Sequence, residues 1–227
     1  MEPKIMMKPT KEQYQALQGA FDYFNEKLFK DSLPQVMLTL NRERNTFGYY
    51  CPSVWTKAQK TENETTWGEI ALNPDYMMKE QDRTERDIYA TLVHEMCHLW
   101  QEYDGSAPHR CYHNKDFAEK MERVGLITSN TGEVGGKRTG QKMTHYIQEG
   151  GPFAKAYEEM PDSLSIPCRT LFAMQGTGGK KKIKKARPST VTYFCPKCGA
   201  TVKGKKDTNV ICGDCMEKML VKTGKDK

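Results

Sequence analysis

The chain has 227 residues, a length that suits one or two domains with one main hydrophobic core. Hydrophobic residues make up 37% and charged residues 28% of the sequence, which excludes a wholly disordered protein but leaves room for solvated segments. No run of about 18 apolar residues occurs, and the first residues lack the apolar core of a signal peptide. We therefore expect a cytoplasmic protein without a membrane span.

The net charge of +6 is distributed unevenly along the chain. Residues 180–227 contain 14 Lys and Arg against 4 Asp and Glu, or +10, whereas the other residues contain 21 against 25, or −4. Lys180–Arg187 is the densest basic run. Such a run can neutralise phosphates, although many charge runs are only solvated linkers. We expect the basic C-terminal region to bind DNA without reading its sequence.

The first third of the chain predicts a helix followed by a small sheet. Thr10 and Gln13 have the spacing of a capping box, and apolar residues follow at alternating steps of three and four. Residues 36–40 and 47–51 are short apolar segments around a polar turn, which predicts a hairpin-like pair, and 67–72 predicts a third strand.

Two more helices are expected in the middle of the chain. Thr84 and Asp87 form a second capping-box pattern ahead of an apolar run that continues to about Tyr103. Another helix is expected to start near Asn114 and to end at Gly125. Helices packed on a small sheet define an α+β fold.

Glycines interrupt the chain after this point and suggest a change of organisation. We expect a first domain over 1–127, a glycine-rich and then basic extension or linker over 128–187, with weak helix near Phe153, and a small C-terminal domain over 188–227. His145 and Tyr146 lie in this extension. A mobile flap could carry them to an active site, but a linker is the simpler interpretation and we assign them no catalytic role.

His94-Glu95-Met96-Cys97-His98 is an H-E-x-x-H sequence inside the second capped helix. The spacing of four puts His94 and His98 on one helix face, where both can bind one Zn²⁺. Glu95 lies beside them and could act as general base, because zinc lowers the pKa of water towards about 7. The pattern indicates metal-assisted peptide hydrolysis. A chance match is disfavoured, since burying two histidines and a glutamate on an otherwise apolar helix is costly without a metal.

A catalytic zinc needs a third protein ligand, for which the sequence offers several candidates. Asp104 has the metzincin spacing, but Gln101 stands where that arrangement needs a glycine. Glu119 could reach back from the third helix. His113 is preferred to His109, because His113 leads directly into that helix whereas His109 lies in the preceding loop.

The C-terminal cysteines form two C-x-x-C pairs separated by 13 residues. Four thiolates in two such turns favour a structural zinc ribbon, while bound iron and a redox dithiol are the weaker alternatives. The ligands would be Cys195, Cys198, Cys212 and Cys215. The other cysteines show no ligand spacing and are interpreted as packing residues: Cys51, Cys97, Cys111 and Cys168.

Together these motifs resemble the SprT family, which includes the Spartan proteases. The resemblance rests on the segments His94–Trp100, His113–Phe117 and Ile70–Pro74 and on the terminal ribbon, and it covers about 10–127 and the C-terminal end. It implies a minimal zincin-like fold with His113 as third ligand, although Asn114 stands where the family usually has glycine. For Spartan-type members it also implies DNA-stimulated cleavage of proteins bound or crosslinked to DNA.

We therefore expect a zinc endopeptidase of SprT type that carries one catalytic and one structural zinc and cleaves proteins on or near DNA. The main alternative is a nucleic-acid-binding zinc-ribbon protein whose zincin-like domain is vestigial or structural. Glu95 argues against that alternative, because a purely structural metal site has no use for a neighbouring carboxylate.

Overall fold

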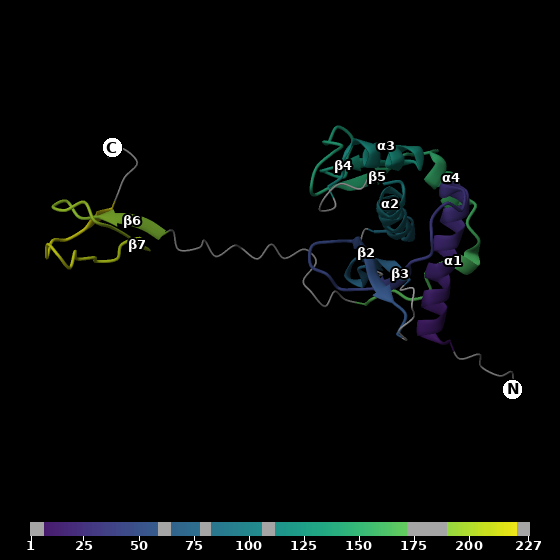
Figure 1. The fold of residues 1–227 in the computed structure, drawn as a ribbon, viewed down its shortest axis with the longest axis horizontal. Helices are drawn as coiled ribbons and strands as arrows, with labels where there is room; N and C mark the ends of the chain where they lie inside the picture. The colour runs from purple at the N-terminus through teal and green to yellow at the C-terminus, as the bar shows by residue number, and fades with distance from the viewer. Residues whose placement is uncertain (1–6, 59–64, 78–82, 106–111, 172–189, 222–227) are drawn as a thin grey trace. The chain divides into compact units, whose positions relative to one another are not determined.

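A computed structural model describes residues 7–58, 65–77, 83–105, 112–171 and 190–221. The chain forms two compact units, Met1–Thr177 and Gly178–Lys227, and each is described by itself. Figure 1 shows the order of the elements along the chain. Among the described helices, none is both long and apolar enough to cross a membrane.

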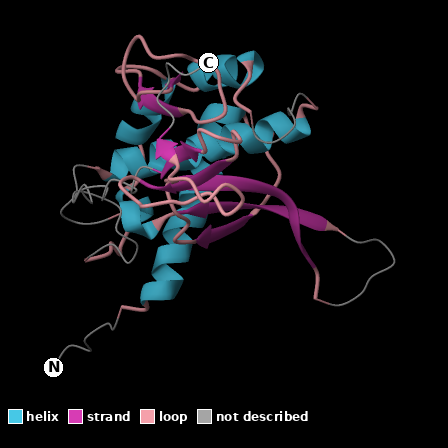
Figure 2. Cartoon of the chain, turned by 90° about the vertical axis from the view of Figure 1, so that its left-hand side faces the viewer, coloured by secondary structure: helices cyan, strands magenta, loops and turns pink. Residues whose placement is uncertain are grey.

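The first unit is a mixed α+β structure, as expected. Its helices and strands are α1 (Pro9–Phe29), β1 (Met37–Leu40), β2 (Gly48–Thr56), β3 (Thr66–Leu72), α2 (Glu85–Tyr103), α3 (Lys115–Arg123), β4 (Leu126–Ser129), β5 (Thr144–Ile147) and α4 (Pro152–Glu158). Two short 3-10 turns complete it at Pro74–Tyr76 and Asp162–Leu164. Figure 2 shows these helices and strands by colour.

The main sheet has the order β1-β3-β2. β3 is parallel to β1 and antiparallel to β2, so the predicted hairpin between the first two strands is wrong. β3 takes the central position because it ends in the apolar run Ile70, Ala71 and Leu72, which is buried. The loop between β1 and β2 is held open by Asn73, whose side-chain amide donates to the carbonyls of Glu43 and Thr46. β2 is thereby left at an edge of the sheet.

Helix α2 runs through the centre of the unit. It begins at the predicted capping box, in which Thr84 and Asp87 bond each other's backbone N–H groups. Its apolar face packs with α1 in one core, where Phe24 contacts the ring of Tyr89. The expected capping box of α1 is absent, because this helix already starts at Pro9. Gln13 instead accepts a hydrogen bond from the backbone N–H of Cys168.

The first unit continues well past residue 127. Strands β4 and β5 pair with each other, and α4 buries Phe153 against Phe24 with ring centroids 5.5 Å apart. Ile166 also belongs to the core. The boundary that the sequence suggested at 127/128 therefore lies inside the first unit, because short elements between glycines carry too little periodicity to be recognised. Residues 172–189, with the predicted basic tether, lie outside the described part.

The second unit is a small three-stranded sheet in the order β7-β6-β8. Its strands are β6 (Thr190–Phe194), β7 (Thr201–Lys205) and β8 (Leu220–Val221). Its small core consists of Tyr193, Cys195, Cys212 and Met219. A core of this size needs an additional crosslink or a metal to be stable.

Candidate metal centre

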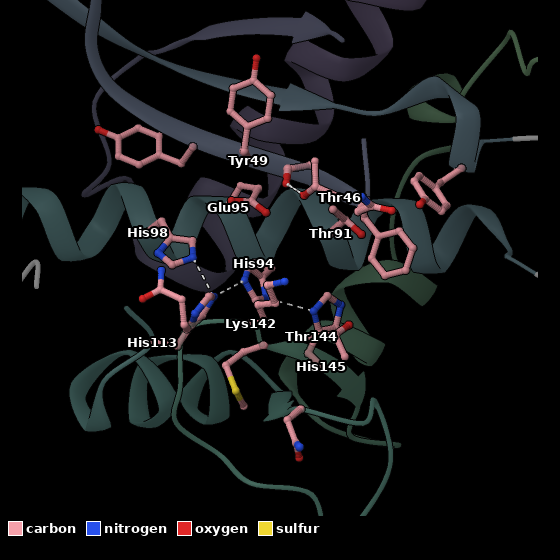
Figure 3. A pocket seen from close by; sticks show the side chains of 18 of the residues that line it. Thr46, Tyr49, Thr91, His94, Glu95, His98, His113, Lys142, Thr144 and His145 are labelled. Carbon is pink, nitrogen blue, oxygen red and sulfur yellow. Dashed lines mark hydrogen bonds between the residues drawn. The ribbon is translucent and has the colours of Figure 1, made fainter. Parts of the chain in front are cut away.

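Three histidines meet at one point beside α2. His94 and His98 lie one turn apart on this helix, and His113 comes from the segment just before α3 (Figure 3). The Nε2 atom of His113 lies 3.2 Å from Nε2 of His94 and 3.1 Å from Nε2 of His98. The structure thus brings together the three histidines that the sequence suggested as ligands.

This arrangement fits a metal ion. Two nitrogen ligands of a tetrahedral zinc lie about 3.3 Å apart, because each is about 2.0–2.1 Å from the ion. Burial lowers the pKa of His94 and His113 and lowers the pKa of His98 to about 3. The imidazoles are therefore neutral at pH 7, and their converging lone pairs are relieved by a shared cation.

The ring of His113 is oriented by the main chain. Its Nδ1 lies 3.2 Å from the carbonyl oxygen of Gly140, which can only accept. The proton of His113 is therefore on Nδ1, and the lone pair on Nε2 faces the other two histidines. Two backbone hydrogen bonds between His113 and Gly140, of 3.0 and 3.1 Å, hold the two segments together.

Asn114 fixes the position of His113 relative to α2. Its side-chain oxygen caps α3 by accepting from the backbone N–H of Phe117 at 2.9 Å and accepts from the buried Gln101 side chain of α2 at 2.7 Å. The Phe117 ring stacks on His98 with centroids 4.2 Å apart. Asn114, which stands where the family that the sequence resembles usually has glycine, therefore caps α3 and links it to α2.

Glu95 lies next to the three histidines and is buried. Burial raises the pKa of the Glu95 carboxyl to about 8, and a hydrogen bond from the backbone N–H of Tyr50 in β2 opposes that shift. The Tyr50 amide also fixes the carboxylate relative to the sheet. A zinc ion held by the neighbouring histidines would lower this pKa again, because an opposite charge favours the carboxylate, which can then accept a proton.

The other candidates for the third ligand lie elsewhere. Asp104 caps the C-terminal end of α2 and is exposed. Glu119 lies on α3 in surface ion pairs with Lys115 and Arg123. His109 is outside the described residues.

A fourth histidine lies at the site, and we did not assign it a role from the sequence. Nδ1 of His145 in β5 is 3.1 Å from Nδ1 of His94 (Figure 3). Burial lowers the pKa of His145 to about 4, and the nearby Arg83 guanidinium contributes. Four of the chain's five histidines thus lie together. The sequence signal for this role is weak. His145 lies in a short segment after the glycines, and its partner His94 is 51 residues earlier in the chain, so spacing does not connect them.

The site opens into a cleft of about 710 Å³. One wall is formed by residues 44–50, at the start of β2, and the opposite wall by residues 141–145. The glycine-rich segment that was interpreted as a linker therefore forms one side of the candidate site. Its Lys142 and Thr144 line the same cleft as His94 and His145 (Figure 3).

The four C-terminal cysteines also come together, as the sequence suggested. One sulfur atom from each lies within 4.8 Å of the others, and Sγ of Cys198 is 3.6 Å from Sγ of Cys212. Sulfur ligands of a tetrahedral zinc lie about 3.8 Å apart, so this cluster fits a zinc ribbon. Of the cysteines interpreted as packing residues, Cys97 is buried, Cys51 and Cys168 are half-buried, and Cys111 is outside the described residues.

Comparison with protein families covers the part of the chain that contains the histidine centre. The model of the SprT-like family matches residues 17–139, more than half of the chain. The chain belongs to the SprT-like family. The match includes α2 and all three histidines of the candidate centre, and it ends before β5 and His145.

One curated protein also resembles part of this SprT-like chain. It is named "Uncharacterized protein in mucB 3'region", from Salmonella typhimurium, and is 56% identical over 41 residues. The match covers 18% of the chain and 55% of that protein, so the chain spans about half of the relative's length. No solved structure matches.

Proposed function

We propose that this SprT-like protein is a zinc-dependent endopeptidase in which His94, His98 and His113 hold the metal and Glu95 is the general base. The observation that carries the proposal is the buried Glu95 carboxylate beside a three-histidine centre that opens into a cleft. Three protein ligands leave one coordination position for water or substrate, as in catalytic zinc sites, whereas structural sites close it with a fourth ligand.

Zinc, when bound, supplies a Lewis acid that polarises the scissile carbonyl and makes water more acidic. The chain itself supplies the proton transfer. Glu95 accepts the proton of the attacking water and returns it to the leaving amine. The hydrogen bond from the Tyr50 amide keeps the carboxylate in one orientation during both steps.

The cleft suits an extended peptide. β2 is an edge strand, and residues 46–50 at its start line the cleft above α2. An edge strand can pair with an extended segment through main-chain hydrogen bonds, which do not depend on the side chains of that segment. We propose an unfolded or flexible protein segment as the substrate.

The proposed location of the substrate is on or near DNA, in the cytoplasm. The support is the charge of +10 in residues 180–227 and the exposure of lysines on the ribbon: Lys197, Lys203, Lys205 and Lys206. Their contacts would be to phosphates, so binding would be strong at low salt and would tolerate any sequence. A DNA-binding ribbon protein with a vestigial metal centre is the alternative, and the buried Glu95 argues against it.

A comparison of two glutamate variants tests the proposal. In the full chain, Glu95→Gln should keep zinc and fold but lose at least about 100-fold in cleavage, because an amide cannot accept the proton. Glu119→Gln, on the exposed face of α3, is the matched control and should cleave like the wild type. Casein and a histone with and without single-stranded DNA serve as substrates, and metal analysis reports zinc. Wild-type cleavage by Glu95→Gln, or no cleavage by the zinc-loaded wild type, would overturn the proposal.

A further inference from the structure

The outer side of the His94 ring faces a histidine from another part of the chain. His94 directs Nε2 towards the other candidate ligands and leaves Nδ1 on the opposite side, 3.1 Å from Nδ1 of His145. We propose that His145 is a positioning residue that accepts a hydrogen bond from Nδ1–H of His94 and so holds His94 in the tautomer that binds metal. The inference rests on the metal centre of the proposed function.

The positions of the protons follow from the geometry. His94 can bind a metal through Nε2 only if its proton is on Nδ1. The single hydrogen bond between the two Nδ1 atoms then runs from His94 to His145, and His145 carries its own proton on Nε2. The reverse assignment would put a proton on Nε2 of His94, pointing at Nε2 of His113, and would block the metal position.

His145 is not itself a ligand of the same ion. The two nitrogens of an imidazole point in diverging directions, so a group facing Nδ1 of His94 lies on the far side of the ring from a metal at Nε2. Consistent with this, the cluster of converging ligand atoms comprises His94, His98 and His113 among the described residues. His145 acts through His94.

The position of His145 is set by strand pairing. β5 is antiparallel to β4, and His145 lies opposite the fully buried Thr128. Gly140, whose carbonyl oxygen accepts from Nδ1–H of the candidate ligand His113, lies five residues earlier in the same segment. Residues 140–145 therefore provide the outer hydrogen-bond partners of two of the three ligands, and such partners typically contribute 10- to 100-fold to metal affinity. Packing of residues 140–145 beside the histidines therefore strengthens metal binding, and metal binding in turn stabilises that packing.

Two substitutions of similar size separate hydrogen bonding from packing. In the full chain, His145→Leu fills much of the same space without an acceptor, whereas His145→Asn places an amide oxygen close to the position of Nδ1. Zinc affinity is measured by competition with a chromophoric chelator, and a His94→Ala variant identifies which release step belongs to the histidine centre. The cysteine centre of the second unit serves as internal control, and thermal unfolding of the metal-free chains reports any loss of fold.

We expect His145→Leu to weaken zinc binding at the histidine centre about 10- to 100-fold. The cysteine centre should be unchanged, and His145→Asn should recover most of the affinity. Equal zinc affinities of His145→Leu and wild type, or equal losses of affinity in the Leu and Asn variants, would overturn the role of His145. The proposed function would not be affected by either result. If the wild-type chain took up zinc only at the cysteines, the proposed function would fall together with this inference.

Discussion

Met216 occupies in the second cysteine turn the backbone position that Gly199 occupies in the first. Each follows the first cysteine of its pair by four residues and donates its N–H to the carbonyl of that cysteine, at 2.9 Å for Gly199 and 2.8 Å for Met216. Both have positive φ, 75° for Gly199 and 53° for Met216. A left-handed conformation costs a residue with a Cβ about 1–2 kcal/mol, so the second turn carries strain that the first avoids.

The first prediction is that Met216→Gly stabilises the ribbon. The Met216 side chain is 78% exposed, so its removal loses little packing. Glycine removes the backbone strain of the folded ribbon but also makes the unfolded chain more flexible. The net gain in the free energy of unfolding should be about 0.5–1 kcal/mol. Amide hydrogen exchange in the zinc-loaded ribbon should slow about two- to fivefold. Gly199→Ala is the matched control and should speed the same exchange; faster exchange in Met216→Gly would contradict the assignment of strain.

A second prediction concerns Phe117, whose ring stacks on His98 and meets His94 and His113 edge-on. Phe117→Leu should lower the free energy of unfolding by about 1 kcal/mol and should also weaken zinc binding at the histidines, because His98 loses the surface that orients it. Met121→Leu, equally buried on the same helix, should affect stability without affecting zinc. Chelator competition and urea unfolding separate the two effects, and parallel zinc losses in both variants would contradict the idea.

The third prediction tests where the first unit ends. A chain cut after residue 127 loses Phe153 from the core and His145 from the metal centre. Loss of such a large buried side chain destabilises by about 3–5 kcal/mol, comparable with the whole stability of a small domain. We expect that chain to show no cooperative urea transition, whereas a chain ending at Thr177 should unfold cooperatively. A cooperative transition of the shorter chain at the wild-type midpoint would restore the boundary suggested by the sequence.

The parts of the site that follow a local pattern could be predicted from the sequence. His94, Glu95 and His98 lie within one helical turn, and the four cysteines lie in two short turns, so spacing alone places their atoms together. The capping box at Thr84 likewise depends on residues three apart. Gln101 disfavours Asp104, and His113 is preferred to His109 because it leads directly into the next helix. The family resemblance implies the same third ligand.

The parts that depend on pairing between distant segments were not predictable in the same way. The order β1-β3-β2 is decided by which strand is most apolar and by the bonds of Asn73 to the loop, and neither is visible in strand periodicity. The role of His145 depends on four-residue strands, too short to give a periodic signal, and on a contact across 51 residues. Glycines around it suggested a linker, although Gly140 is itself a partner of His113.

The last prediction concerns the basic C-terminal region. Because residues 180–227 carry +10 and the rest of the chain −4, nearly all affinity for phosphate should lie after Thr177. A chain ending at Thr177 should keep cleavage of an unstructured peptide, since the proposed catalytic residues lie in the first compact unit. Its DNA binding and any DNA-stimulated cleavage should be lost. Binding by the full chain should weaken steeply with salt and show little sequence preference.

Titration of labelled single- and double-stranded DNA at two salt concentrations, with both chains, checks this prediction. Cys212→Ala in the full chain is an informative control, because it disrupts the ribbon but keeps every basic residue. If its binding stays high, the lysines act as a flexible polycation; if its binding falls, the folded ribbon presents them. Equal DNA binding by the full and shortened chains would place the DNA contacts in the first unit, and absence of binding at low salt by the full chain would assign the basic region to a protein partner.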